Sequence, residues 1–145
     1  MGSINSRVLT TNKLLRLPSP ILLCVNRPDF DKAISDAGFH EMSLNFPLAK
    51  ELSGKTEKEI SASIMSTVSR LLPKCEKIYL TDYEMLFDPR YELDVIKLFC
   101  EISRHKKLIV QWCGSSNENF LTYAELGYDD YAKYKISDYQ IVCVI

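Results

Sequence analysis

Glycine, histidine and an excess of either charge are scarce in this chain. It has five glycines and two histidines among 145 residues, and its 18 basic and 19 acidic side chains leave a net charge of −1. This balance removes the sequence-independent attraction to nucleic acid or acidic membranes that a strongly basic domain has. His40 and His105 lie far apart in the sequence, so a zinc site would need an unusual ligand set. Neither direct nucleic-acid binding nor a zinc site is therefore expected.

Long apolar runs and paired cysteines are also missing. No apolar stretch approaches the length of a membrane span, which is about 18 residues, and the first residues lack the apolar core of a signal peptide. The five cysteines form no C-x-x-C pair, and four of them lie in or beside apolar runs, where a free thiol behaves as a small hydrophobic group. These absences predict a cytoplasmic protein in a reducing compartment, without membrane contact.

The chain does have enough apolar sequence for one core. Apolar residues make up 46% of it, and a domain of about 150 residues buries roughly 68–70% of the surface that its unfolded chain exposes. We expect a single domain over residues 1–145. Residues 1–20 form an N-terminal extension, because the prolines at its end stop any helix there.

Short apolar runs alternate with helical patterns along the rest of the chain. The helical patterns cover residues 29–37 and 56–72, and a further helix opens at residues 88–89. The expected strands are residues 21–26, 40–46, 77–82, 108–113 and 139–145. Strands that alternate with helices predict an α/β protein, a three-layer sandwich with a mostly parallel sheet of about five strands.

Polar residues that follow the strands are the candidates for a site, because ligands of a parallel sheet bind outside the carboxyl ends of its strands. Asp82 and Glu84 follow an apolar strand, as the acids of a Walker B segment do. One carboxylate of such a pair holds Mg²⁺ and the other polarises the attacking water. Acids after strands also occur as helix caps or turn residues, and that interpretation stays open. Asn45 and Gln111 complete the set of strand-end candidates.

The glycine-rich phosphate loop that accompanies a Walker B segment is absent where it belongs. The segment that follows the first strand, residues 26–32, has no glycine; Arg27 and Lys32 are its only cations, and Pro28 removes an amide donor. A second candidate is the Gly54-Lys55-Thr56 segment, which leads into a helix. Its alternative explanation is a helix end at Gly54 followed by the start of the next helix.

Two further clusters favour structural roles. The aromatic residues of the segment 120–139 are interleaved with charges of both signs, which indicates core or protein contacts rather than stacking on single-stranded nucleic acid. The basic run at residues 104–107 lies near the end of a helix, where cations are favoured, so it needs no nucleic-acid ligand to explain it.

The second half of the chain resembles BrxF, the small P-loop-type component of type 3 BREX systems, which defend bacteria against phages. The resemblance rests on LFDP at residues 86–89, the W-x-G strand end at 112–114 and LTYA at 121–124. It implies a P-loop fold of the ASCE type, with residues 21–25 as the P-loop strand and residues 80–82 as the Walker B strand. Asp82 then holds the metal, Glu84 polarises the water and Gln111 lies near the end of the sensor strand.

The resemblance and the missing phosphate loop together predict an accessory subunit of an antiphage defence system, with a degenerate P-loop fold, that works through protein contacts and not as an enzyme. Its expected partners are other subunits of the system or a second copy of the chain, with nucleic acid reached only indirectly. One alternative is a nucleotide-binding switch or weak ATPase that uses Mg·ATP, through Arg27 and Lys32 or through Gly54, Lys55 and Thr56. A second alternative is a nucleic-acid-binding accessory protein that uses residues 104–107.

Overall fold

A parallel sheet of six strands organises the molecule. A computed structural model describes residues 2–5 and 8–145, and the order of the strands across the sheet is β1-β9-β2-β5-β4-β3. Every neighbouring pair runs parallel. The strands are β1 (Gly2–Ile4), β2 (Ile21–Leu23), β3 (His40–Ser43), β4 (Lys77–Thr81), β5 (Lys107–Gln111) and β9 (Val142–Val144).

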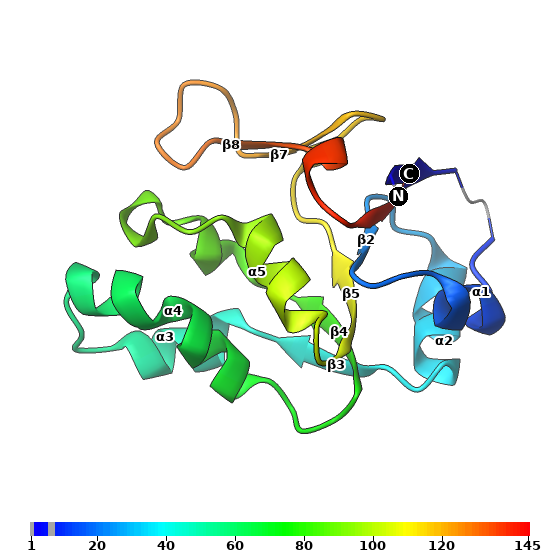
Figure 1. The fold of residues 1–145 in the computed structure, drawn as a ribbon, viewed down its shortest axis with the longest axis horizontal. Helices are drawn as coiled ribbons and strands as arrows, with labels where there is room; N and C mark the ends of the chain where they lie inside the picture. The colour runs from blue at the N-terminus through cyan, green and yellow to red at the C-terminus, as the bar shows by residue number, and fades with distance from the viewer. Residues whose placement is uncertain (1, 6–7) are drawn as a thin grey trace.

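Helices cover both faces of this sheet. They are α1 (Thr11–Arg16), α2 (Pro28–Asp36), α3 (Asn45–Leu52), α4 (Glu57–Leu71) and α5 (Val95–Ile102), with 3₁₀ turns η1 (Glu84–Phe87), η2 (Pro89–Tyr91) and η3 (Ile136–Asp138). Figure 1 shows α1 and α2 on one side of the sheet and α3, α4 and α5 on the other.

Two separate cores follow from the alternation of side chains along the strands. Ile21 and Leu23 of β2 pack in the core beneath α1 and α2, whereas Leu22 packs in the core beneath α3, α4 and α5. Residues 78–80 and 108–110 divide between the two cores in the same way. The expected α/β sandwich of three layers with a parallel sheet is confirmed, and the sheet has six strands because β1 of the N-terminal extension pairs with β9.

Local sequence explains where most helices begin. The Thr56 hydroxyl accepts a hydrogen bond from the Glu59 amide, at 3.2 Å, and so caps α4. The expected helix from Asp88 is wrong at its start, because Pro89 begins only a short 3₁₀ turn. Glu92 then adopts a left-handed backbone with φ 51°, and Asp94 caps α5 by accepting from the Lys97 amide at 3.0 Å.

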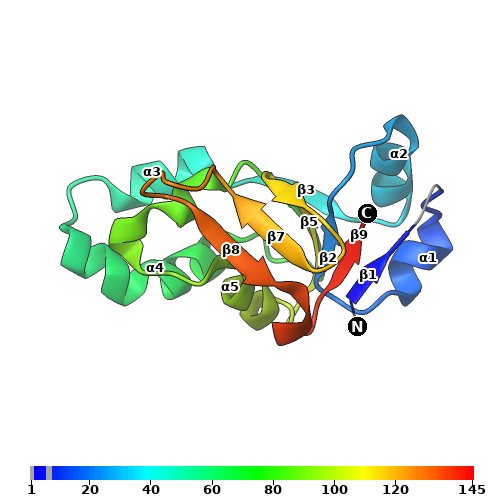
Figure 2. The same ribbon diagram turned by 90° about the horizontal axis from the view of Figure 1, so that it is seen from above.

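A small antiparallel sheet lies beyond the end of β5, and the sequence patterns did not predict it. Its strands are β6 (Ser115–Ser116), β7 (Phe120–Tyr123) and β8 (Ala132–Lys135), and Figure 2 shows it lying across one end of the main sheet. Leu121 and Tyr134 are buried in the core of α3, α4 and α5. Trp112 joins the two sheets, because its ring meets those of Phe87 and Tyr134 edge to face. The aromatic cluster thus contributes to the core here.

Helices in the described part of the chain are all too short or too polar to cross a membrane. Within residues 2–5 and 8–145, histidine, cysteine and acidic side chains do not gather in a group of three that could hold a metal ion. All five cysteines carry free thiols.

Candidate functional site

The carboxyl ends of β2, β5, β4 and β3 meet at one edge of the sheet. The segment that leaves β2 leads to α2 on one face, those that leave β3 and β4 lead to α3 and α5 on the other face, and the segment that leaves β5 leads to the small sheet. Such a divergence forms the crevice in which open parallel sheets bind ligands. The structure brings Asp82, Glu84, Asn45 and Gln111 to this edge.

Asp82 joins the end of β4 to the end of β3. Its carboxylate accepts a hydrogen bond from the Ser43 hydroxyl at 2.7 Å. Its carbonyl oxygen accepts from the amides of Leu44 and Asn45, at 3.1 and 2.6 Å. The residue has φ 48°, in the left-handed region that aspartate tolerates better than most side chains. The carboxylate is exposed but directed toward β3.

Glu84 is held on the same side by Asn45. The Asn45 side-chain amide donates to Glu84 Oε2 at 2.6 Å, and its oxygen accepts from the Met85 amide at 3.1 Å. Asn45 is the first residue of α3, so it fixes that helix against η1. Both Walker B-like carboxylates therefore contact β3 and α3, on the side of β4 that faces away from β2.

Gln111 braces three strands at the centre of the edge. Its side-chain amide donates to the Leu23 carbonyl at 3.1 Å, and its side-chain oxygen accepts from the Tyr79 hydroxyl at 3.3 Å. Its backbone carbonyl accepts from the Tyr83 hydroxyl at 2.7 Å, which itself accepts from the Cys113 amide at 3.2 Å. These contacts engage both polar ends of the Gln111 side chain within the protein.

Burial keeps the two tyrosines of this brace protonated. The pKa of Tyr79 rises to about 12, mainly because of burial and then because of the charges of Asp31 and Glu41. The pKa of Tyr83 is raised well beyond its usual range by its burial in the core, with Cys113 and Glu84 adding to the effect. Both hydroxyls act as hydrogen-bond donors at neutral pH and not as bases.

The connection from β2 to α2 leaves little room to surround a phosphate. It consists of residues 24–27, and Pro28 occupies the first turn of α2. Arg27 is exposed and Lys32 pairs with Asp36 at 3.4 Å, with 79% of the Lys32 side chain in solvent. The first turn of α2 carries Asp29 and Asp31, which occupy the positive end of the helix dipole that an anion would use.

The Gly54-Lys55-Thr56 segment lies between two helices and not at the end of a strand. Gly54, with φ 81°, follows the end of α3, and Thr56 begins α4 as its cap. The segment lies at the extremity of the α3 and α4 pair, on the side remote from the sheet, in both Figure 1 and Figure 2. The structure does not bring it together with the strand-end residues.

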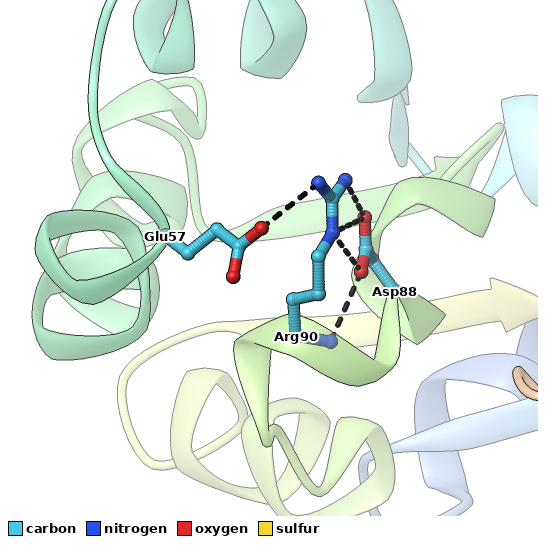
Figure 3. A network of polar contacts seen from close by, with 3 residues as sticks. All are labelled: Glu57, Asp88 and Arg90. Atoms are coloured by element: carbon cyan, nitrogen blue, oxygen red, sulfur yellow. Dashed lines mark hydrogen bonds and ion pairs between the residues drawn. The ribbon is translucent and has the colours of Figure 1, made fainter.

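An ion-pair network fixes η2 beside the start of α4 (Figure 3). Arg90 contacts both oxygens of Asp88, with the closest contact at 2.6 Å, and reaches Glu57 at 3.3 Å. The Arg90 guanidinium holds the pKa of Asp88 below its usual range. This network orders the segment that follows Glu84.

The basic run of residues 104–107 is engaged within the protein. Lys106 donates to the carbonyls of Pro73 and Cys75, and Lys107 donates to the carbonyl of Leu15. Arg104 pairs with Glu101 at 3.3 Å. These contacts secure neighbouring segments at the amino edge of the sheet.

The sequence patterns identified the acids together with Asn45 and Gln111, but not Ser43 or Tyr83. Ser43 and Tyr83 carry no motif, and only their placement beside Asp82 and Gln111 gives them a role. The one available signal was the position of Ser43 within an expected strand. Comparison with family models, curated proteins and solved structures finds no match to this chain.

Proposed function

We propose that this chain is an accessory subunit of a bacterial antiphage defence system, built on a degenerate P-loop scaffold that works through protein contacts. The proposal combines the BrxF-like motifs of the second half of the chain with the geometry of the sheet edge. It treats the chain as a subunit that does not hydrolyse nucleotide.

The order of the strands supports the P-loop part of the proposal. β5, the strand that ends in Gln111, lies between β2 and β4. An ASCE-type fold has its additional strand at this position, between the P-loop strand and the Walker B strand. On such a scaffold, the residues that follow β2 would contact phosphate and the acids that follow β4 would hold the metal.

The β2 to α2 connection provides the main evidence for the proposed loss of nucleotide binding. A phosphate cradle needs glycines so that consecutive amides can point at the phosphates, whereas this connection has no glycine and leads into Pro28. Asp29 and Asp31 would repel a triphosphate at the helix start. The residues of this connection therefore do not fit Mg·ATP.

The carboxylates that follow β4 have a structural use instead of holding a metal. Asp82 is bonded to Ser43 and Glu84 to Asn45, so both hold β3 and α3 against the end of β4. The nucleotide-switch alternative draws no support from Lys55, because its segment lies at the remote end of α3. The nucleic-acid alternative gains no support from Lys106 and Lys107, because their contacts with backbone carbonyls already give them a structural role.

Calorimetric titration with Mg·ATP and with Mg·GTP tests the proposal. We expect no heat of binding at nucleotide concentrations up to about 1 mM, which corresponds to a binding free energy weaker than about −4 kcal/mol. The Asp82→Ala and Lys55→Ala variants should give the same flat titrations. Micromolar binding that Asp82→Ala abolishes would overturn the proposal, and binding lost only in Lys55→Ala would favour the switch.

A further inference from the structure

An acidic loop with exposed apolar side chains projects from the small sheet. The acidic loop, residues 124–131, joins β7 to β8 and contains Glu125, Asp129 and Asp130 but no lysine or arginine. Leu126 is 88% exposed and Tyr128 is 65% exposed. Two large apolar side chains exposed so close together favour contact with another protein.

More negative charge lies beneath the acidic loop. Two hollows of about 420 and 560 Å³ separate it from η1 and η2, and both are lined by Asp88, Asp129 and Asp130. Glu92 and Asp94 add to one of them, which also contains Lys133, and Glu84 adds to the other, which also contains Arg90. Because acidic side chains outnumber basic ones in both hollows, this end of the molecule attracts a basic surface.

A basic surface, complementary in charge to the acidic loop, lies at the opposite edge of the sheet. The basic hollow, about 530 Å³, is formed where β4 and β5 begin, and apolar Leu17 and Pro18 form part of its wall. The remaining lining residues are Ser19, Glu76, Lys77, Ser103, His105, Lys106 and Lys107.

The lysines of the basic hollow are held in place and crowd one another. Lys77 and Lys107 are register partners in the β4 and β5 ladder, and burial together with the charge of Lys77 lowers the pKa of Lys107. The Lys77 ammonium donates to the Ala37 carbonyl at 2.7 Å. Each ammonium has three N–H groups, so donors remain for an incoming carboxylate, which would also relieve the repulsion between the two lysines.

The two surfaces lie at opposite ends of the molecule. The basic hollow is at the amino ends of β4 and β5, whereas the acidic loop lies beyond the carboxyl end of β5, as the position of the β7 to β8 loop in Figure 1 shows. One copy cannot satisfy both at once. Two copies can, because the loop of one then faces the hollow of the next in a head-to-tail contact.

We propose that the acidic loop of one copy docks into the basic hollow of a second copy. Leu126 and Tyr128 pack against Leu17 and Pro18, while the loop carboxylates approach the lysines of the hollow. The proposal deepens the proposed function and rests on it in one respect, namely that the chain works through protein contacts. The docking contact does not involve nucleotide. Failure of the chain to self-associate and detection of nucleotide binding are therefore separate results, and each bears on a different proposal.

Sedimentation velocity over a wide concentration range tests the contact. A contact carried by one loop is smaller than a standard interface, so the range should extend from about 5 to about 500 µM protein. We expect the sedimentation coefficient to rise with concentration at about 50 mM salt and to rise less at about 500 mM salt, because screening weakens the charge attraction. A monomer at every concentration would overturn the proposal.

Loop variants test which residues carry the association. The double variant with Leu126→Ser and Tyr128→Ser should remain monomeric. The double variant that reverses two charges, with Asp129→Lys and Asp130→Lys, should remain monomeric as well. Phe46→Ser is the matched control, since Phe46 is 78% exposed and lies on α3, and it should associate like the unmodified chain. Circular dichroism establishes that each variant is folded. Association that survives both loop variants, or that only Phe46→Ser removes, would overturn the proposal.

Mixing distinguishes a head-to-tail contact from a symmetric one. A hollow variant, Pro18→Asp with His105→Glu, keeps its acidic loop, and the Leu126→Ser with Tyr128→Ser variant keeps its hollow. Each should be monomeric alone, and together they should form a dimer that grows no further. A mixture that stays monomeric contradicts the proposal. Binding of a labelled DNA duplex to the unmodified monomer but not to the hollow variant would also contradict the proposal, because the basic hollow would then be a nucleic-acid site.

Discussion

At the scale of single residues, the candidate site is defined by hydrogen bonds that direct its acids away from β2. Asp82 and Glu84 were predicted from their place after an apolar strand, and their position at the sheet edge is confirmed. Their direction depends on Ser43 and Asn45, which lie 39 residues earlier in the chain. A sequence motif specifies a side chain and its neighbours along the chain, whereas the direction of a carboxylate depends on donors brought in by another strand.

Tyr83 offers a test of the brace at the centre of the edge. Tyr83→Phe removes a hydroxyl that donates to the Gln111 carbonyl and accepts from the Cys113 amide. We expect the free energy of unfolding to fall by about 1–3 kcal/mol, because buried backbone groups lose their partner. Urea unfolding measures the change. The control Tyr128→Phe, at an exposed ring, should leave the midpoint unchanged, and equal midpoints for both variants would exclude the brace.

The Tyr83→Phe variant should also differ from the unmodified chain in how its melting temperature depends on alkaline pH. Burial raises the pKa of Tyr83 above its ordinary value of 10. Since the folded-state pKa is the higher one, the stability that the neutral phenol contributes is complete below about pH 10 and is lost as the pH rises further. We expect the melting temperature of the unmodified chain to fall more steeply than that of Tyr83→Phe between about pH 9.5 and 11.5. The other buried tyrosines are common to both proteins, so the difference between the slopes reports Tyr83.

At the scale of elements, the segment of residues 54–56 can be interpreted as a phosphate loop or as a connection between two helices, and only the neighbouring elements distinguish the two. Gly54-Lys55-Thr56 has the letters of a phosphate loop, but it follows α3 and not a strand. The Thr56 and Glu59 spacing is that of a capping box, and the structure shows the Thr56 hydroxyl in contact with both the amide and the carboxylate of Glu59 at the start of α4. The late start of α5 was not predicted, because Glu92 adopts a left-handed backbone conformation and the sequence has neither glycine nor asparagine at that position to indicate it.

Thr56 distinguishes a helix cap from a ligand loop. Thr56→Ala should lower the free energy of unfolding by about 0.5–2 kcal/mol, since the first turn of α4 loses its side-chain acceptor. Thr56→Ser should restore most of this loss, and Lys55→Ala should have no comparable effect. Urea unfolding again supplies the values. A loss in Lys55→Ala as large as in Thr56→Ala would argue against the cap.

At the scale of the whole molecule, the small sheet and the main sheet share one core. Leu121 and Tyr134 of the small sheet are buried with Leu98 and Phe99 of α5. Trp112 is the single tryptophan of the chain and lies at their junction, 5% exposed. The small sheet therefore buries its apolar side chains in the core beneath α3, α4 and α5 and not in a core of its own.

Coincident unfolding is the expected consequence. Trp112 fluorescence follows the junction, and far-ultraviolet circular dichroism follows all helices and strands, so both should give the same urea midpoint for a two-state domain. Leu121→Ala, which removes a fully buried side chain of β7, should lower the free energy of unfolding by about 2–5 kcal/mol and shift both signals equally. A fluorescence transition that precedes the loss of helix would show that the small sheet unfolds independently.

The sequence by itself determined the α/β class, the approximate position of five strands, the capped start of α4 and the absence of a glycine-rich loop after the first strand, although residues 45–46 of one expected strand begin α3 instead. These features depend on residues close together in the chain: apolar runs, capping pairs and missing glycines. The tertiary structure alone decided that β1 completes the sheet, that Asp82 and Glu84 bond to β3 and α3, and that acidic and basic surfaces lie at opposite edges. Those features depend on contacts between segments far apart in the chain, where packing and hydrogen-bond geometry select among arrangements that the local sequence permits equally.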